Sequence, residues 1–491
     1  MLAGAAVELA RRLGVRLPGD LALLAWAPAS VDVPDGAGPE FLGTLHEQLL
    51  GRGERRARGA FYTPADVAAR LVGWAVGGLD RPVVLDPACG GGAFLLEAAR
   101  HTDRLVAMDI DPLAVAVTEA SIFLATGRRP CTLVADALMS DWPAADAVVG
   151  NPPFLAQLGS DTARGRERAL ALSARWGDAA RGYVDDAALF LLAASRHAPR
   201  VALLQPESVL AARDAKAIRG ELAPALADVW VPDRPLFDAA VRVVGVMLDR
   251  TSPSDVDGDR WSALLADARG VPHVALVGHG TLGDHATVTA GFRDEYYGLA
   301  PFVTEAGPGA APLITAGLID PGVSRWGQRP ARFGRRRWDA PAIDLAGLAA
   351  SPLAAWATRQ LVPKVLVATQ TPVVEAVVDE AGEWLPCTPV ITVVPRTIDV
   401  WHVLAALLAP PVTAWALREA AGAALSSNAV KLSAAQLRTL PLPCPGAAWD
   451  EAADLLRAGD VRGAAPAACR AYGVDDPAVT DWWSARLPSS P

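Results

Sequence analysis

The stretch PVVLDPACGGGAFLLEAAR, residues 82–100, decides the fold of the first half of the chain. An apolar run ends in Asp86, three glycines follow at 90–92, and a helical pattern begins directly after them. Glycine lets a backbone approach a ligand closely, and a carboxylate at a strand end lies at the mouth of a sheet. The dinucleotide order GxGxxG is absent, so the stretch favours a site where Asp86 faces the amino group of a ligand. A purely structural turn is the alternative.

Strand-like runs alternate with helical patterns from about residue 82 to residue 250. The runs are VVLDP, LVAMDI, DAVVGN, VALLQ and VVGVML, and the helical patterns include AFLLEAARH and DDAALFLLAASRH. This alternation predicts an α/β fold with a doubly wound, parallel sheet. The chain has 491 residues, 52% hydrophobic and 20% charged, which excludes a disordered or polyelectrolyte protein.

The remaining segments predict further domains. Residues 1–60 carry apolar residues at helical spacing and predict a helical leader before a core domain at 61–250. The polar run TSPSDVDGDR predicts a linker, placed at 251–270. Residues 271–445 mix short strands with a helix around WHVLAALLA and predict a mixed α+β domain, followed by a helical tail at 446–491.

Two more carboxylates follow the next predicted strands. Asp109 ends the run LVAMD about 20 residues after the glycines, where nucleotide-type sites hold a ribose diol, and Asp136 ends the next predicted strand. Three carboxylates at the ends of three successive parallel strands define one cleft. Aspartates that cap the following helices would explain any one of them, but explain all three less well.

The sharpest signal is the sequence DAVVGNPPF, in which a strand runs into Asn151, Pro152, Pro153 and Phe154. Prolines fix the chain and lack NH donors, so carbonyls there can accept hydrogen bonds from a ligand. An amide oxygen and a backbone carbonyl could take both hydrogens of an exocyclic amine, while the aromatic ring offers a stacking face. A rigid turn after a strand is the alternative.

Motif for motif, residues 61–250 resemble S-adenosylmethionine-dependent, amino-methylating DNA methyltransferases of the gamma motif order. The motifs are the YTP element at 62–64, the loop DPACGGGAF, the acidic strand end at Asp109, Asp136 and NPPF. The resemblance implies a Rossmann-like class I methyltransferase sheet followed by a target-recognition domain. It implies methyl transfer to the N6 amine of an adenine that is flipped out of duplex DNA, in a restriction-modification or phage-defence setting.

The resemblance assigns roles to individual residues. Asp109 would bind the ribose hydroxyls of S-adenosylmethionine, Ile110 would pack on its adenine, and Asp136 would accept from the adenine amine. The residues around the methionine moiety would be Tyr62, Thr63, Pro64, Asp86, Ala88, Cys89, Gly90 and Gly92. The catalytic residues would be Asn151, Pro152, Pro153 and Phe154.

The target base would stack on Phe154 and on Phe237, which stands just before the last predicted strand, where an aromatic residue can equally belong to the core. Enzymes that methylate protein glutamine or amines in RNA carry similar NPP motifs, so an RNA or protein substrate is one alternative. A non-catalytic DNA-binding subunit of a larger assembly is another. A labelled methyl-transfer assay separates the last of these from an enzyme.

The chain carries a formal net charge of −9, so nucleic acid would have to bind through a local patch. One basic cluster has interleaved aromatic residues and predicts contacts with DNA, with a solvated basic loop as the alternative: Arg325, Arg329, Arg332, Arg335, Arg336 and Arg337.

Five scattered cysteines without CxxC spacing predict neither a metal site nor a disulfide frame. The absence of an apolar run of 18 residues predicts a cytoplasmic protein without membrane spans. The only nuclease-like D-x-K, at 214–216, falls in a helix of the core, so we expect methylation without cleavage by this chain. Restriction or defence-system subunits are possible partners.

Overall fold

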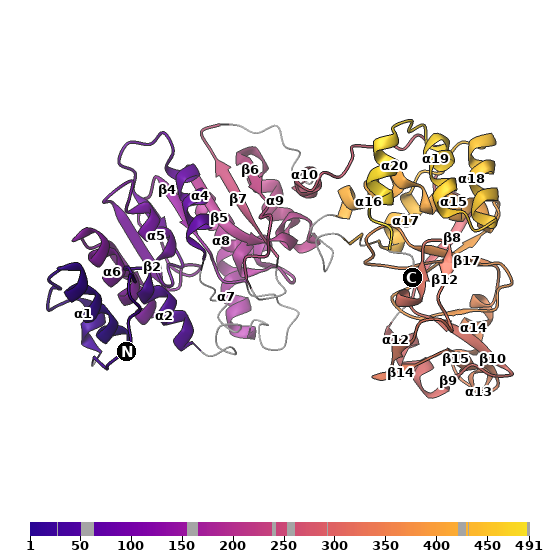
Figure 1. Ribbon diagram of the computed structural model, residues 1–491, viewed down its shortest axis with the longest axis horizontal. Helices are drawn as coiled ribbons and strands as arrows, with labels where there is room; N and C mark the ends of the chain where they lie inside the picture. Colours follow the sequence, from indigo (N-terminus) through magenta and orange to yellow (C-terminus); the bar gives the residue numbers. More distant parts are fainter. Residues whose placement is uncertain are drawn as a thin grey trace. The chain divides into compact units, whose positions relative to one another are not determined.

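The computed structural model describes residues 1–26, 28–50, 63–154, 165–237, 242–252, 261–291, 293–420, 429–430 and 432–488. The chain divides into two compact units, Met1–Ala268 and Arg269–Pro491 (Figure 1). Each unit has its own apolar cores, so each is described by itself.

The first unit is built on a seven-stranded sheet in the order β3-β2-β1-β4-β5-β7-β6. Its strands are β1 (Val84–Asp86), β2 (Leu105–Asp109), β3 (Cys131–Val134), β4 (Ala147–Gly150), β5 (Arg200–Pro206), β6 (Leu226–Trp230) and β7 (Val243–Asp249). All neighbours are parallel except at β7, which runs antiparallel to both β5 and β6. The strand order reverses between β1 and β4, which is where ligands bind in open α/β sheets.

The predicted doubly wound α/β fold is confirmed, with two local differences. β7 is inserted antiparallel between β5 and β6, a pairing that the apolar run VVGVML does not reveal because both orientations bury it equally. The prediction that Asp136 ends a strand is wrong by two residues: β3 stops at Val134, and the Asp136 carboxylate accepts from the Leu138 backbone N–H at 3.1 Å.

Helices flank this sheet and the chain before it. They are α1 (Leu2–Leu13), α2 (Phe41–Leu49), α4 (Ala65–Val76), α5 (Ala93–Ala98), α6 (Pro112–Thr126), α7 (Arg166–Trp176), α8 (Asp186–His197), α9 (Lys216–Leu222) and α10 (Trp261–Ala268). Helix α6 begins where Asp111 accepts from the Leu113 N–H and Pro112 fixes the first turn. Its buried residues on both sides explain its weak amphipathicity.

The N-terminal helices are part of this unit. Leu9 of α1 and Leu42 and Leu45 of α2 share one apolar core with Val117 and Ala120 of α6. Helices α1 and α2 fall within the predicted helical leader at 1–60, whose last residues lie outside the described ranges. Helices α1 and α2 therefore cover one side of α6, a helix that flanks the sheet.

The predicted linker at 251–270 differs from the structure in its second half. Residues 261–268 form α10, with Trp261 fully buried and Leu265 one turn later, so this helix packs into the first unit. The spacing of these two apolar residues is helical, but a short helix next to a polar run gives a weak signal. The division between the units falls at 268/269.

The second unit is a mixed α+β structure. One four-stranded sheet has the order β18-β10-β15-β9 and another has the order β17-β16-β19-β8. Their strands are β8 (Ala286–Ala290), β9 (Val303–Glu305), β10 (Ala310–Ile314), β15 (Pro341–Asp344), β16 (Lys364–Val367), β17 (Ala376–Asp379), β18 (Leu385–Pro386) and β19 (Ile391–Pro395). Two small pairs are β11 (Ile319–Asp320) with β12 (Val323–Ser324) and β13 (Ala331–Phe333) with β14 (Arg336–Trp338).

Helices complete the second unit: α11 (Leu282–His285), α12 (Arg293–Leu299), α13 (Leu345–Ala349), α14 (Ala354–Gln360), α15 (Val400–Leu408), α16 (Pro410–Ala420), α17 (Ala434–Thr439), α18 (Ala447–Arg457), α19 (Val461–Ala471) and α20 (Pro477–Ser484). The expected helical tail thus consists of α18 to α20, which pack on α15 and α16 instead of extending from the unit.

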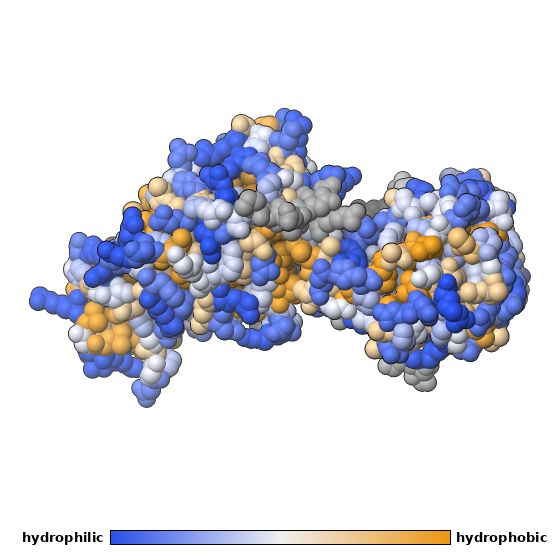
Figure 2. Space-filling view, turned by 90° about the horizontal axis from the view of Figure 1, so that it is seen from above, coloured by the Kyte–Doolittle hydropathy of each residue, from blue (hydrophilic) through white to orange (hydrophobic). Residues whose placement is uncertain are grey.

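In the described part of the chain, no single helix is long and apolar enough to cross a membrane. Only the pair Val400–Leu408 and Pro410–Glu419, bent by 62°, meets the length and hydropathy criteria together. On the face shown in Figure 2, both units carry hydrophilic surface interrupted by separate hydrophobic patches.

Candidate functional site

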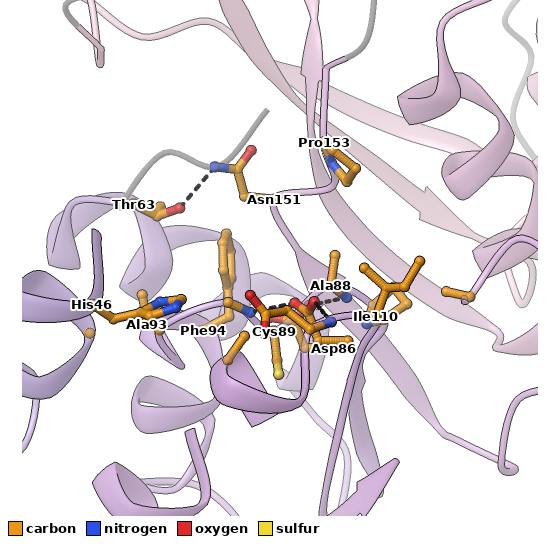
Figure 3. Close-up of a pocket in the computed structure, with 18 of the residues that line it drawn as sticks. His46, Thr63, Asp86, Ala88, Cys89, Ala93, Phe94, Ile110, Asn151 and Pro153 are labelled. Carbon is orange, nitrogen blue, oxygen red and sulfur yellow. Dashed lines mark hydrogen bonds between the residues drawn. The ribbon is translucent and has the colours of Figure 1, made fainter. Parts of the chain in front are cut away.

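A cavity of about 580 Å³ lies at the carboxyl ends of β1, β2 and β4 (Figure 3). This volume is in the range of small-molecule sites. The sequence-predicted residues that line it are Thr63, Asp86, Ala88, Cys89, Gly90, Asp109, Ile110, Asp136, Asn151 and Pro153. The fold therefore brings together residues from five separate motifs.

Asp86 forms the floor at the end of β1. Its side chain is 1% exposed and accepts from the Ala88 backbone N–H at 3.0 Å. Burial, with a smaller contribution from the nearby carboxylate of Asp109, raises the pKa of Asp86 to about 8, although the hydrogen bond from Ala88 lowers it. A cation brought to this carboxyl group would relieve that cost, so the position is suited to an ammonium group of a ligand.

Asp109 connects the end of β2 with the glycine loop. Its two carboxylate oxygens accept from the backbone N–H groups of Gly90 and Asp111, each at 2.9 Å. Burial raises the pKa of Asp109, and these backbone hydrogen bonds partly offset the rise. The neighbouring Ile110 is 66% exposed at the edge of the cavity, where it offers an apolar surface to a ring.

The glycine loop requires glycine for two distinct reasons. Gly90 and Gly92 have φ values of 51° and 86°, in the left-handed region that other residues rarely adopt. Gly91 instead makes a close backbone approach: a Cβ atom added there would lie 2.6 Å from the Cα atom of Gly43 in α2. This contact joins the N-terminal helices to the wall of the cavity.

Cys89 is buried in this loop, and burial raises the pKa of its thiol well above the ordinary value. A protonated, enclosed thiol is a poor nucleophile, which leaves Cys89 with a packing role in the loop.

Asn151 follows β4 and lies opposite the start of α4. Its amide nitrogen donates to the Thr63 hydroxyl at 3.2 Å (Figure 3). The YTP and NPPF motifs thus meet at one hydrogen bond, between Thr63 and Asn151, which are 88 residues apart in the sequence. That bond fixes which end of the amide is the donor and which is the acceptor.

Of the residues predicted for this site that the structure describes, five do not line the cavity. Tyr62 lies outside the described residues. Pro64 precedes α4 and Gly92 precedes α5, and Pro152 is buried in the turn after β4. Phe154 is 8% exposed in the apolar core of the unit, and Phe237 packs against that same core.

An arginine bridge on the cavity wall was not predicted from the sequence. Arg168 of α7 places one guanidinium nitrogen 2.5 Å from Asp136 and the other 3.5 Å from Asp186, which starts α8. Asp185 caps α8 by accepting from the Ala187 N–H. The two aspartates at 185 and 186 therefore indicate a helix start in the sequence, and not a ligand site. Nothing in the arginine-rich sequence RGRER singles out its last arginine as the one that faces inward.

The wall also includes residues from the N-terminal helices that were predicted only as a helical leader. Gly43, His46 and Glu47 of α2 and Leu50 line the cavity. Their helical spacing was visible in the sequence, but the partner of that helix was not.

Residues 38–223 match the family model described as N-6 DNA Methylase. They form a domain of that family. The matched range includes α2, the glycine loop, Asp109, Asp136 and the turn at Asn151.

Two curated relatives match parts of the chain. The chain is 33% identical over 116 residues to the type II methyltransferase M.XamI from Xanthomonas campestris pv. amaranthicola, which covers 22% of this chain and 21% of that protein. It is 29% identical over 87 residues to the type II methyltransferase M.VspI from Vibrio sp. (strain 343), covering 17% and 21%. The chain thus spans about a fifth of the length of these relatives.

A solved structure resembles the fold over a larger part of the chain. The chain is similar to the cryoEM structure of a DrdV–DNA complex, with a TM-score of 0.51 and 12% sequence identity, over 86% of this chain and 59% of that one. At this identity the likeness concerns the fold alone.

Outside the N-6 DNA methylase domain, the structure separates the predicted DNA-binding arginines into two groups. Arg325 and Arg329 both pair with Asp320 of β11, at 2.6 and 3.0 Å, so their guanidinium groups form ion pairs inside the second unit. This pairing was not predicted from the sequence because Asp320 stands just before the basic cluster. Exposed positions on or beside the β13–β14 hairpin hold Arg332, Arg335, Arg336 and Arg337.

Proposed function

We propose that the chain is an S-adenosylmethionine-dependent methyltransferase that modifies the N6 amine of adenine in duplex DNA. The single observation that carries this proposal is the hydrogen bond between Asn151 and Thr63 at the edge of the cavity with the strand-end carboxylates. The family match over 38–223 supports it.

The donor set of the cavity fits S-adenosylmethionine. Asp86, buried with a pKa of about 8, would bind the ammonium group of the methionine moiety. Asp109 would accept from the ribose hydroxyls, and Ile110 would pack on the adenine ring. Asp136, held by Arg168 on one carboxylate oxygen, would accept from the adenine amine.

When bound, this cofactor supplies an electrophilic methyl group. The chain supplies the acceptors that position the attacking amine: the amide oxygen of Asn151 and the carbonyl of Pro152. Thr63 accepts from the Asn151 amide nitrogen and thereby directs the amide oxygen towards the amine hydrogens. Two acceptors on those hydrogens orient the nitrogen lone pair, and the proton leaves after attack, so no strong base is needed.

A base inside the duplex cannot reach this site, so it must be flipped out, at a cost of a few kcal/mol. We propose Phe154 and Phe237 as the stacking residues. Because both lie in or against the apolar core, their rings have to turn towards the cavity to contact a base.

Two relatives of the domain are named type II methyltransferases, which supports a restriction-modification setting. A phage-defence setting is the related proposal, with partner subunits of such a system as binding partners. We place cleavage outside this chain.

The experiment is long-read sequencing of DNA from a methylation-free host that expresses the full chain or its Asn151→Ala variant. We expect N6-methyladenine at one motif with the wild type and none with the variant. Calorimetry with S-adenosylhomocysteine should show that the variant still binds the cofactor product. Methylation by the Asn151→Ala variant at the wild-type level would refute the mechanism, and no methylation by the wild type would refute transfer by this chain alone.

A further inference from the structure

The β13–β14 hairpin has an unusual turn. Its strands pair antiparallel with Ala331 opposite Trp338, Arg332 opposite Arg337 and Phe333 opposite Arg336. The two turn residues, Gly334 and Arg335, have φ values of 57° and 64°. Both therefore occupy the left-handed region of a type I′ turn, where glycine, asparagine and aspartate are preferred. The second position holds an arginine despite its unfavourable backbone conformation.

The charges of the hairpin also oppose its stability. Arg332 and Arg337 stand directly opposite each other, and like charges in that position repel. Within the described ranges, no carboxylate lies within ion-pair distance of either residue, or of Arg335 and Arg336. This is notable in a chain with a net charge of −9. Arg325 and Arg329, only a few residues earlier, share the carboxylate of Asp320.

The hairpin is nevertheless held firmly in place. Phe333 is buried in an apolar core and contacts Tyr296 of α12, with ring centroids 4.5 Å apart. The Tyr296 hydroxyl accepts from the Gly334 N–H at 3.1 Å, and the Trp338 indole donates to the Phe333 carbonyl at 3.1 Å. Next to Tyr296, the ring of Tyr297 is 64% exposed. A rigid support thus presents cations and an aromatic ring to solvent.

We propose that this hairpin, with Tyr297 beside it, binds the phosphate backbone of duplex DNA. A two-stranded ribbon is narrow enough to enter the major groove, and arginines on its outer side can then contact phosphates on either strand. Phosphates would neutralise the repulsion between Arg332 and Arg337. Arg325 and Arg329 are excluded from this role because Asp320 already binds them. The choice of DNA as the polyanion rests on the proposed function, whereas the position of the surface rests on the hairpin itself.

The test compares two doubly substituted variants of the full chain. Arg332→Ala/Arg337→Ala removes the opposed pair, and Arg359→Ala/Arg462→Ala removes two exposed arginines on α14 and α19. Both variants change the net charge equally. Binding of a 30-bp fluorescent DNA duplex is measured by anisotropy at several salt concentrations.

We expect the hairpin variant to bind at least ~10-fold more weakly, with the slope of log K against log salt reduced by about 2, since each phosphate contact contributes roughly 0.9. The control variant should keep the wild-type slope. Because a repulsive pair is lost, the hairpin variant should melt at the same or a higher temperature. A purely structural role would lower both the melting temperature and the affinity.

Equal slopes in all three proteins would overturn the proposal, as would a loss of RNA binding with duplex binding unchanged. Genomic methylation by the wild-type chain is read separately. If the wild type methylates DNA while the hairpin variant binds normally, the hairpin proposal fails and the proposed function stands. If the wild type does not methylate DNA, the proposed function fails whatever the hairpin binds.

Discussion

Replacing Gly91 by alanine should move helix α2 away from the cofactor cavity. The added Cβ atom would lie 2.6 Å from the Gly43 Cα atom, about 0.8 Å short of the 3.4 Å at which ordinary contact begins. Both neighbours are backbone, so no flexible side chain can yield. The relaxation must separate the glycine loop from α2, which carries Gly43, His46 and Glu47 into the cavity wall.

Overpacking of this kind destabilises a protein by roughly 1–3 kcal/mol, which corresponds to a melting temperature lower by about 3–10 °C in a unit of this size. A displacement near 1 Å at a positioned site also lowers the rate of methyl transfer by ~10–100-fold. We would measure melting by scanning calorimetry and binding of S-adenosylhomocysteine by titration. The Gly43→Ala variant should behave alike, because its Cβ atom would lie 2.6 Å from the Gly91 carbonyl oxygen.

Gly73→Ala is the matched control. Gly73 is exposed within α4 and an added Cβ atom meets nothing within 4 Å, so alanine should stabilise the helix by up to ~1 kcal/mol. If Gly91→Ala melted and bound ligand like the wild type, the close contact between α2 and the glycine loop would not govern the cavity, and the reasoning would be refuted.

Three further outcomes are expected. Burial raises the pKa of Asp86 from 3.8 to about 8 on folding, so the folded state binds this proton more tightly and the free energy of unfolding should fall as pH rises from about 4 to 8. The Asp86→Asn variant should show a smaller fall in melting temperature between pH 5 and 8. The same fall as in the wild type would contradict this prediction. Arg168→Ala leaves Asp136 without its bridge and should weaken S-adenosylhomocysteine binding ~5–10-fold by calorimetry; equal affinity would remove Arg168 from the site. Asp320→Ala removes the carboxylate that pairs with Arg325 and Arg329, and should lower the free energy of unfolding in denaturant by about 2–3 kcal/mol while leaving DNA affinity unaltered. Weaker DNA binding with wild-type stability would contradict this assignment.

Local motifs made the fold and most of the cavity predictable from sequence. Asp86, Asp109 and Asn151 each end or follow a short apolar strand, and parallel strands bring such ends to one edge of a sheet. The roles assigned to these residues remain predictions that binding measurements have to test.

What the sequence could not reveal depends on contacts between distant segments. Arg168 meets Asp136 across 32 residues, and no periodicity links them. The division of the arginine cluster depends on Asp320, which lies five residues before Arg325, the first arginine of the cluster. Phe154 could not be assigned from the sequence for a different reason. An aromatic residue next to a motif fits base stacking and core packing equally well, and in the structure Phe154 is buried in the core.

The packing of α1 on α6 has a consequence for exchanging parts between such proteins. The family match starts at residue 38, yet Leu9 of α1 fills the same core as Val117 of α6. A transplanted fragment that began at residue 38 would expose the apolar side of α6 and would tend to aggregate. Residues 268/269 are a workable junction for grafting a different second unit, whereas residue 38, where the family match begins, is not a place to cut.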